Sequence, residues 1–168
     1  YVMMAFRIAW FKVYQPLAYY AAYFTIRAEG SFNAPVILKG LESQKAELAR
    51  IAALEHSTAV EKGNATVIEV AAEMYLRGME FLPIDLDRSD ASEFKMVDGK
   101  LLPPFNCIPA LGDAVAKEIV RARDEHLFTS KEDLKKRGKV SQSIIDTMDS
   151  MGILKNMPDE EQISLFSF

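Results

Sequence analysis

The pattern of hydrophobic and polar positions predicts a mainly helical chain. Residues 2–14 and 17–28 are apolar on almost every side and are separated by Pro16, which suits the first turn of a second helix. Residues 41–55 carry their apolar side chains on one face and predict an amphipathic helix. Helices that are apolar all round are normally buried on several sides, so residues 2–28 should need more cover than their neighbours here supply.

A further helix is predicted after a break at Gly63 and Asn64. Thr66 and Glu69 have the spacing of a capping box, in which each side chain satisfies a backbone N–H at the start of a helix. Apolar residues follow at helical spacing, at Val67, Val70, Ala71, Met74 and Tyr75. Gly78 fits the position just after the helix end, where a positive φ is needed.

A short β-hairpin interrupts the helices. Residues 80–86 are expected to be extended, and Pro83 would confine any strand there to an edge. Residues 93–102 predict a hairpin, because apolar residues flank an Asp98-Gly99 turn. The chain beyond Pro104 predicts short helices, so the expected fold class is mainly α with a small β-hairpin.

Composition is that of an ordinary globular protein, with 49% hydrophobic and 26% charged residues. The single cysteine, Cys107, lies in an apolar stretch and predicts a buried thiol in a reducing compartment. His56 and His126 have no partners at metal-ligand spacing. No run reaches the roughly 18 uncharged residues of a membrane span. The chain does not begin with methionine, which suggests a piece of a longer protein.

The charge is unevenly distributed along the chain. The formal net charge is −4, but residues 95–140 carry ten basic and seven acidic side chains. Residues 1–94 and 141–168 are both net acidic. The middle segment is therefore the part that would face a polyanion such as nucleic acid.

The segment 108–123 predicts a short apolar helix, a tight turn at Gly112 and a second helix. We expect Gly112 to take a positive φ, and the free N–H groups of the following helix to suit a phosphate. The candidate DNA-binding residues here are Ala110, Leu111, Gly112, Ala114 and Lys117. The segment resembles a helix-hairpin-helix motif in which Ala110 replaces the first glycine. The alternatives are an αα-hairpin that only packs, or a helix that Asp113 caps.

Residues 131–152 predict a second unit of the same kind. Ser130 should cap a helix over 131–137, and Ser141 a helix that follows a turn at 138–140. The candidate DNA-binding residues are Lys135, Lys136, Arg137, Lys139 and Ser141. Four cations at one turn repel one another unless an anion such as DNA phosphate joins them, although a solvated basic loop is the alternative. Three or four phosphate contacts would give a log K against log salt slope of roughly −3.

Two carboxylates, Asp85 and Asp87, have the spacing at which many polymerases hold metal ions. No third carboxylate has a clear relation to them, so a turn is the preferred interpretation. No catalytic residues and no metal ligands are predicted in this chain.

The C-terminal residues resemble the sliding-clamp-binding peptide of bacterial replication proteins, Gln-x-Ser/Asp-Leu-Phe. The matching residues are Gln162, Ser164, Leu165 and Phe166. Large apolar residues at a chain end favour a partner's pocket over a core, and burying one Leu and one Phe would give a modest affinity. The alternative is a frayed tail with accidental apolar residues.

Four stretches together resemble the C-terminal region of the PolC-type bacterial DNA polymerase III α subunit. They are 1–24 (YVMMAFRIAWFKVYQPLAYYAAYF), 84–94 (IDLDRSDASEF), 102–106 (LPPFN) and 130–141 (SKEDLKKRGKVS). Residues 30–63 match poorly, and Ser167-Phe168 extends past the usual end. The resemblance implies that the catalytic palm, its Mg²⁺ and the exonuclease lie upstream of Tyr1. It also implies that Asp85 and Asp87 are not catalytic, and that the protein is cytoplasmic and nucleoid-associated in a bacterium.

These observations predict three regions. Residues 1–92 would be the end of the polymerase fingers, 93–157 a β-hairpin with a tandem helix-hairpin-helix duplex-binding module, and 158–168 a flexible clamp-binding tail. The expected partners are duplex DNA, the bacterial sliding clamp and the remainder of the polymerase chain. Two alternatives stay open: a stand-alone helix-hairpin-helix DNA-binding or scaffold protein, and an interaction module that binds only the clamp.

Overall fold

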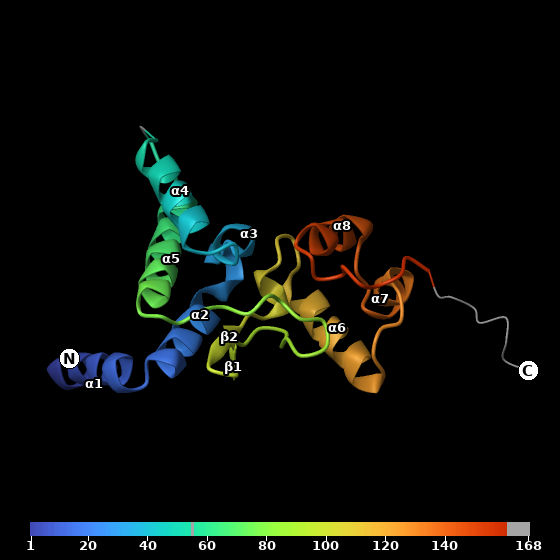
Figure 1. Ribbon diagram of the computed structural model, residues 1–168, viewed down its shortest axis with the longest axis horizontal. Helices are drawn as coiled ribbons and strands as arrows, with labels where there is room; N and C mark the ends of the chain where they lie inside the picture. The colour runs from blue at the N-terminus through green and yellow to red at the C-terminus, as the bar shows by residue number, and fades with distance from the viewer. Residues whose placement is uncertain (55, 161–168) are drawn as a thin grey trace, which may run out of the picture.

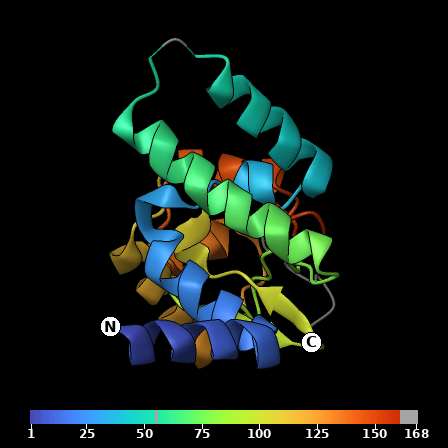
Figure 2. The same ribbon diagram turned by 90° about the vertical axis from the view of Figure 1, so that its left-hand side faces the viewer.

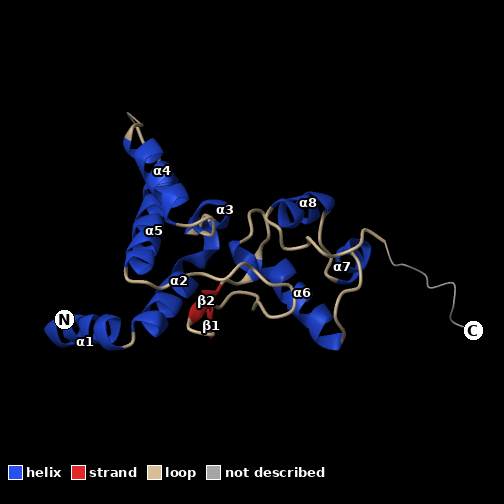
Figure 3. Cartoon of the chain, viewed as in Figure 1, coloured by secondary structure: helices blue, strands red, loops and turns tan. Residues whose placement is uncertain are grey.

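The computed structural model describes residues 1–54 and 56–160, and it is mainly helical with one small sheet (Figures 1 and 3). The elements in chain order are α1 (Val2–Tyr14), α2 (Pro16–Ser31), α3 (Ala34–Ile37), α4 (Leu41–Ala52), α5 (Ala59–Leu76), β1 (Lys95–Val97), β2 (Lys100–Leu102), the 3-10 helix η1 (Phe105–Cys107), α6 (Asp113–Glu125), α7 (Lys131–Arg137) and α8 (Gln142–Ser150). The expected fold class, mainly α with a small β-hairpin, is confirmed.

The N-terminal half is arranged around α2, which packs against α1, α5, η1 and both strands. Helices α4 and α5 lie side by side and extend away from the rest of the chain (Figures 1 and 2). Helix α1 lies at the N-terminal tip of the structure, beside α2, and has no buried residue. Many of its large apolar side chains are exposed, among them Phe6, Trp10 and Val13.

Four phenylalanines form the centre of this half. Phe24 of α2 lies 5.1 Å from Phe81, and Phe32 lies 5.2 Å from Phe94, measured between ring centroids. These rings meet edge-on or tilted, which is the favourable arrangement for aromatic pairs. The cluster joins α2 to the extended segment 80–86 and to the start of the β-hairpin.

The hairpin follows the sequence prediction. β1 and β2 are antiparallel, with Lys95 opposite Leu102 and Val97 opposite Lys100. Asp98 and Gly99 both have positive φ (51° and 75°), as the tightest hairpin turns require. Phe81 forms a bridge to the same hairpin at Leu101, so part of the extended segment lies along it.

Helix α5 begins earlier than the sequence predicted. Its capping box is Thr58 with Glu61, where Thr58 Oγ1 accepts from Glu61 N at 3.2 Å and Glu61 Oε2 accepts from Thr58 N at 2.8 Å. The prediction of a cap at Thr66 is wrong, and Thr66 Oγ1 instead donates to Lys62 O inside the helix. The predicted break at Gly63-Asn64 is also wrong, because α5 continues through both residues. Tertiary packing outweighs the roughly 1 kcal/mol propensity cost of one glycine.

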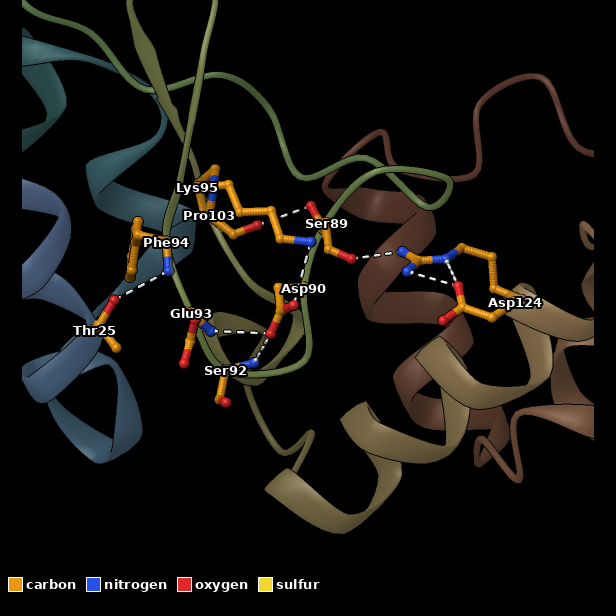
Figure 4. A network of polar contacts seen from close by, with 10 residues as sticks. Thr25, Ser89, Asp90, Ser92, Glu93, Phe94, Lys95, Pro103 and Asp124 are labelled. Carbon is orange, nitrogen blue, oxygen red and sulfur yellow. Dashed lines mark hydrogen bonds and ion pairs between the residues drawn. The ribbon is translucent and has the colours of Figure 1, made fainter. Parts of the chain in front are cut away.

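A polar network joins the N-terminal half to the helices that follow (Figure 4). Thr25 Oγ1 of α2 accepts from Phe94 N at 3.1 Å, and the fully buried Ser89 donates from Oγ to Pro103 O at 2.8 Å. Arg123 of α6 donates to Ser89 O at 2.6 Å. Segment 85–90 is therefore held from both sides, which fixes the position of α6 relative to α2.

Candidate nucleic-acid interface

The same turn geometry occurs twice in this chain, once in each hairpin. In the first, Ala110 has a φ of 64° and is followed by Leu111, which is 3% exposed. In the second, Lys139 has a φ of 53° and is followed by Val140, also 3% exposed. Each left-handed residue thus turns the chain so that the next side chain enters the core and a helix begins.

The residue after each buried position starts a helix without a side-chain cap. Gly112 precedes α6 with φ −78° and ψ 163°, and Ser141 precedes α8 with φ −72° and ψ 157°. Neither makes a side-chain cap hydrogen bond, so the prediction that the Ser141 side chain caps α8 is wrong. The N–H groups of the first two residues of each helix remain available to an outside acceptor, whereas Ile144 N of α8 already donates to Ser141 O at 3.1 Å.

The prediction that Gly112 takes a positive φ is also wrong. The turn is closed one residue earlier, where Leu111 N donates to Ile108 O at 3.1 Å, and the positive φ falls on Ala110. A Cβ built on Gly112 would meet nothing within 4 Å, so neither its φ nor its surroundings in the fold require glycine. The open space above it lies where an external group would approach the helix.

The remaining candidates on the first hairpin are divided between the surface and the core. Ala110, Ala114 and Lys117 are exposed, whereas the Leu111 side chain is buried and can offer only its backbone. Asp113 does not cap α6. It is the first residue of the helix, and its Oδ1 accepts from Asn106 Nδ2 at 3.0 Å while its Oδ2 lies 3.7 Å from Lys117 Nζ.

Three lysines are exposed around the second hairpin. Lys135 Nζ donates to Gln142 Oε1 at 3.0 Å, Lys136 Nζ lies 2.9 Å from Glu132, and Lys139 Nζ lies 2.8 Å from Glu118. DNA phosphate was the anion expected at this turn, but Lys136 and Lys139 each already pair with a carboxylate of the chain. Both are surface pairs of the kind that stabilise a fold by little, because water already solvates the separated ions.

Glu118 connects the two units. Hydrogen bonds from Arg121 and from Lys139, both favouring the charged form, lower the pKa of the Glu118 carboxyl to about 2. Since Glu118 lies on α6 and Lys139 on the second turn, this carboxylate ties the first unit to the second. The sequence alone gave no signal for this contact between residues far apart in the chain.

The Arg137 side chain makes its contacts within the protein. Its guanidinium pairs with Asp133 at 2.9 Å, donates to the backbone oxygens of Ala122 and His126, and lies 4.9 Å from the Phe128 ring centroid. These contacts hold α7 against the end of α6. Its side chain is 20% exposed, so the charge predicted to face phosphate is largely used inside the protein.

Other candidate chemistry is not supported. Asp85 accepts from Asp87 N and Arg88 N and pairs with Arg88 Nε at 2.8 Å, as expected of a turn. Within 1–54 and 56–160, no group of three or more His, Cys, Asp or Glu could hold a metal ion. Cys107 is buried, and desolvation raises its thiol pKa, which excludes a reactive thiolate.

The described part of the chain contains no helix that is both long and apolar enough to cross a membrane. The candidate clamp-binding residues Gln162, Ser164, Leu165 and Phe166 lie outside the described residues.

Comparison with known proteins agrees with this geometry. The family described as "Helix-hairpin-helix motif" matches residues 78–163. The chain is 49% identical over 166 residues to the DNA polymerase III PolC-type of Thermotoga maritima. It is 47% identical over 167 residues to that of Clostridium perfringens and 48% over 167 residues to that of Bacillus subtilis. Each match covers 99% of this chain and 12% of the relative, so the chain spans about an eighth of their length.

Proposed function

The chain belongs to the helix-hairpin-helix family, and from this we propose that its two hairpins hold duplex DNA through the phosphate backbone. The observation that carries the proposal is the repeated backbone geometry, with Ala110 and Lys139 left-handed and α6 and α8 starting without side-chain caps. Backbone N–H groups at a helix start bind phosphate without reading base sequence.

Gly112 supports this proposal for the first hairpin. Glycine is not needed there by backbone conformation or by packing, and its lack of a side chain leaves the N–H groups of α6 open to close approach. Asp113 beside it disfavours an anion, so this hairpin would act by backbone contact at short range rather than by charge.

Charge would come mainly from the second hairpin. Lys135, Lys136 and Lys139 are exposed, and a phosphate can replace their weak partners in this chain. About three such contacts would give a log K against log salt slope of roughly −3.

The test is fluorescence anisotropy of a labelled duplex with the 168-residue chain, titrated with salt. Lys135→Ala with Lys139→Ala should weaken binding about tenfold at low salt and make the slope shallower by about two. The matched control is Lys45→Ala with Lys62→Ala, which removes the same charge from the exposed surface of α4 and α5. Equal effects of the two variants would refute the placement, and no binding by the folded wild type would refute DNA binding by this chain.

We also propose that the chain is a region of a PolC-type DNA polymerase, on the basis of the identity along nearly its whole length. The described residues do not fit Mg²⁺, because Asp85 is engaged by Arg88 and the backbone. The catalytic palm and its Mg²⁺ would then belong to other parts of the longer polymerase, and the chain alone should not extend a primer. Primer extension by the purified chain would contradict this.

The exposed helix α1 fits a chain that is covered by other parts of such a polymerase. Phe6, Trp10 and Val13 are 70%, 51% and 62% exposed, although Lys12 anchors the helix to Glu73 of α5 at 2.8 Å. A contiguous exposed apolar face on a helix normally marks an interface. Trp10 is the only tryptophan, so 5-fluorotryptophan placed there should change its ¹⁹F shift when the separately purified remainder of the polymerase is added. An unchanged shift would argue against this interface.

The C-terminal residues are proposed to bind the bacterial sliding clamp. A weak peptide contact would tether the polymerase and raise the effective concentration of DNA at the hairpins. Calorimetry with a purified clamp should give a Kd in the micromolar range, about −8 kcal/mol or weaker. Leu165→Ala with Phe166→Ala should abolish the signal, and Leu54→Ala with Val60→Ala, which removes exposed apolar groups elsewhere, should not.

A further inference from the structure

The segment that leads to the C-terminal residues is attached to the second hairpin unit. Lys131 N donates to Pro158 O at 2.9 Å, and Glu132 N donates to Asp159 O at 3.1 Å. Asp159 Oδ1 also lies 3.0 Å from Lys131 Nζ. Two backbone hydrogen bonds and an ion pair therefore hold the chain against the start of α7.

This attachment brings acidic side chains to a cleft that two of the proposed DNA-binding lysines, Lys135 and Lys136, also line. A cleft of about 450 Å³ lies between α7 and α8. Its lining includes Lys131, Lys135, Lys136, Gln142, Asp159 and Glu160. We call Asp159 and Glu160 the acidic segment.

The position of the acidic segment matters most for Lys135, which lines the same cleft. It donates to the neutral amide of Gln142, and none of the carboxylates in the described part of the chain forms an ion pair with it. The acidic segment enters the same cleft. A carboxylate and a phosphate present similar oxygen acceptors to a lysine, so the two compete for these cations.

We propose that the acidic segment is an internal competitor of the DNA phosphates at the second hairpin. This inference rests on the proposed function of that hairpin. Without DNA, the segment lies against α7 and lowers the local positive potential. A bound duplex replaces it, because several linked phosphates release condensed counterions that two carboxylates cannot match.

The competition has a consequence for the proposed clamp-binding residues, since Gln162 follows Glu161 directly. A partner that draws Asp159 and Glu160 away from α7 would also remove the competitor and tighten DNA binding. Thermodynamic reciprocity then requires DNA to tighten the binding of that partner by the same factor.

The decisive experiment compares two variants of equal charge in the anisotropy assay. Asp159→Asn with Glu160→Gln should bind duplex DNA roughly three- to tenfold more tightly than wild type at low salt, with the gain shrinking as salt screens the charges. Glu42→Gln with Glu69→Gln changes the net charge equally on the exposed surface of α4 and α5 and should leave the affinity within about twofold of wild type.

The outcomes separate the two proposals. If wild type binds DNA and both variants bind alike, the acidic segment is not a competitor, while the proposed function stands. If neither wild type nor the Asp159→Asn, Glu160→Gln variant binds DNA, the proposed function fails and the inference fails with it.

A second measurement follows the segment directly. A spin label on Glu160→Cys is selective because the natural Cys107 is 3% exposed. It should broaden the backbone amide signals of Lys135 and Gln142, and saturating duplex should restore them. Broadening that persists with DNA fully bound would overturn the inference.

Discussion

The two hairpins have the same turn geometry and different electrostatics. Ala110 and Asp113 leave the first hairpin without a net positive charge, whereas Lys139 occupies the left-handed position of the second and α8 has no acidic residue in its first turn. The turn geometry therefore does not depend on which side chain stands at the left-handed position. It follows that one hairpin can contribute close backbone contact and the other can contribute charge.

The largest expected effect separates cations that hold the fold from cations that face outward. Arg137→Ala removes the pair with Asp133, whose side chain is 10% exposed, and the bonds to two carbonyls. Breaking a largely buried pair should lower the free energy of unfolding by about 3 kcal/mol. Urea unfolding measures this, with Lys135→Ala as the control that should change stability by less than about 0.5 kcal/mol. Equal stability of the two variants would show that Arg137 contributes no more to the fold than the exposed Lys135.

A second prediction compares the glycines of the two hairpins. A Cβ on Gly138 would lie 2.7 Å from Leu134 O, so Gly138→Ala should destabilise the fold by about 2 kcal/mol through overpacking. Gly112→Ala meets open space and should leave the unfolding midpoint in urea almost unchanged. If Gly112 admits a phosphate, the same substitution should weaken DNA binding. A stable Gly112→Ala variant with full DNA affinity would show that this glycine serves no ligand.

A third prediction concerns the left-handed residue of the first hairpin. Ala110 has a φ of 64°, which costs a side chain about 1 kcal/mol or more relative to glycine. Ala110→Gly should therefore stabilise the chain by about 0.5 kcal/mol after the extra entropy of the unfolded glycine is subtracted. Thermal unfolding checks this, and a loss of stability would mean that the alanine methyl group makes a favourable contact.

The smallest effect concerns the carboxylate that joins the hairpins. Arg121 and Lys139 together lower the Glu118 pKa to about 2, so Lys139→Ala should raise this pKa partway toward its ordinary value. A group with a depressed folded pKa contributes stability above its unfolded pKa of about 4.3, and that stability is lost as pH falls toward the folded pKa. NMR titration of the Glu118 side chain gives the shift directly. An unshifted pKa in the variant would show that Arg121 alone sets it.

The helices are the part of the fold that could be predicted best. Residues 131–137 form α7 with a Ser130 cap, where Ser130 Oγ accepts from Asp133 N at 3.0 Å, and the hairpin turn is at Asp98-Gly99 as expected. Both depend on short-range signals. The predicted start of α5 was wrong because Thr58 and Thr66 each begin a Thr-x-x-Glu pattern. Only the packing of the whole helix decides between the two.

The sequence by itself determined the helical class, the β-hairpin, the turn at 138–140 and the concentration of basic residues near that turn. These features follow from hydrophobic spacing and local turn chemistry, which act over a few residues. The tertiary structure decided which cations are already paired, as Lys139 is with Glu118 and Arg137 with Asp133. It also placed Asp159 beside Lys131, because helix packing brings together charges whose separation in the chain carries no local signal.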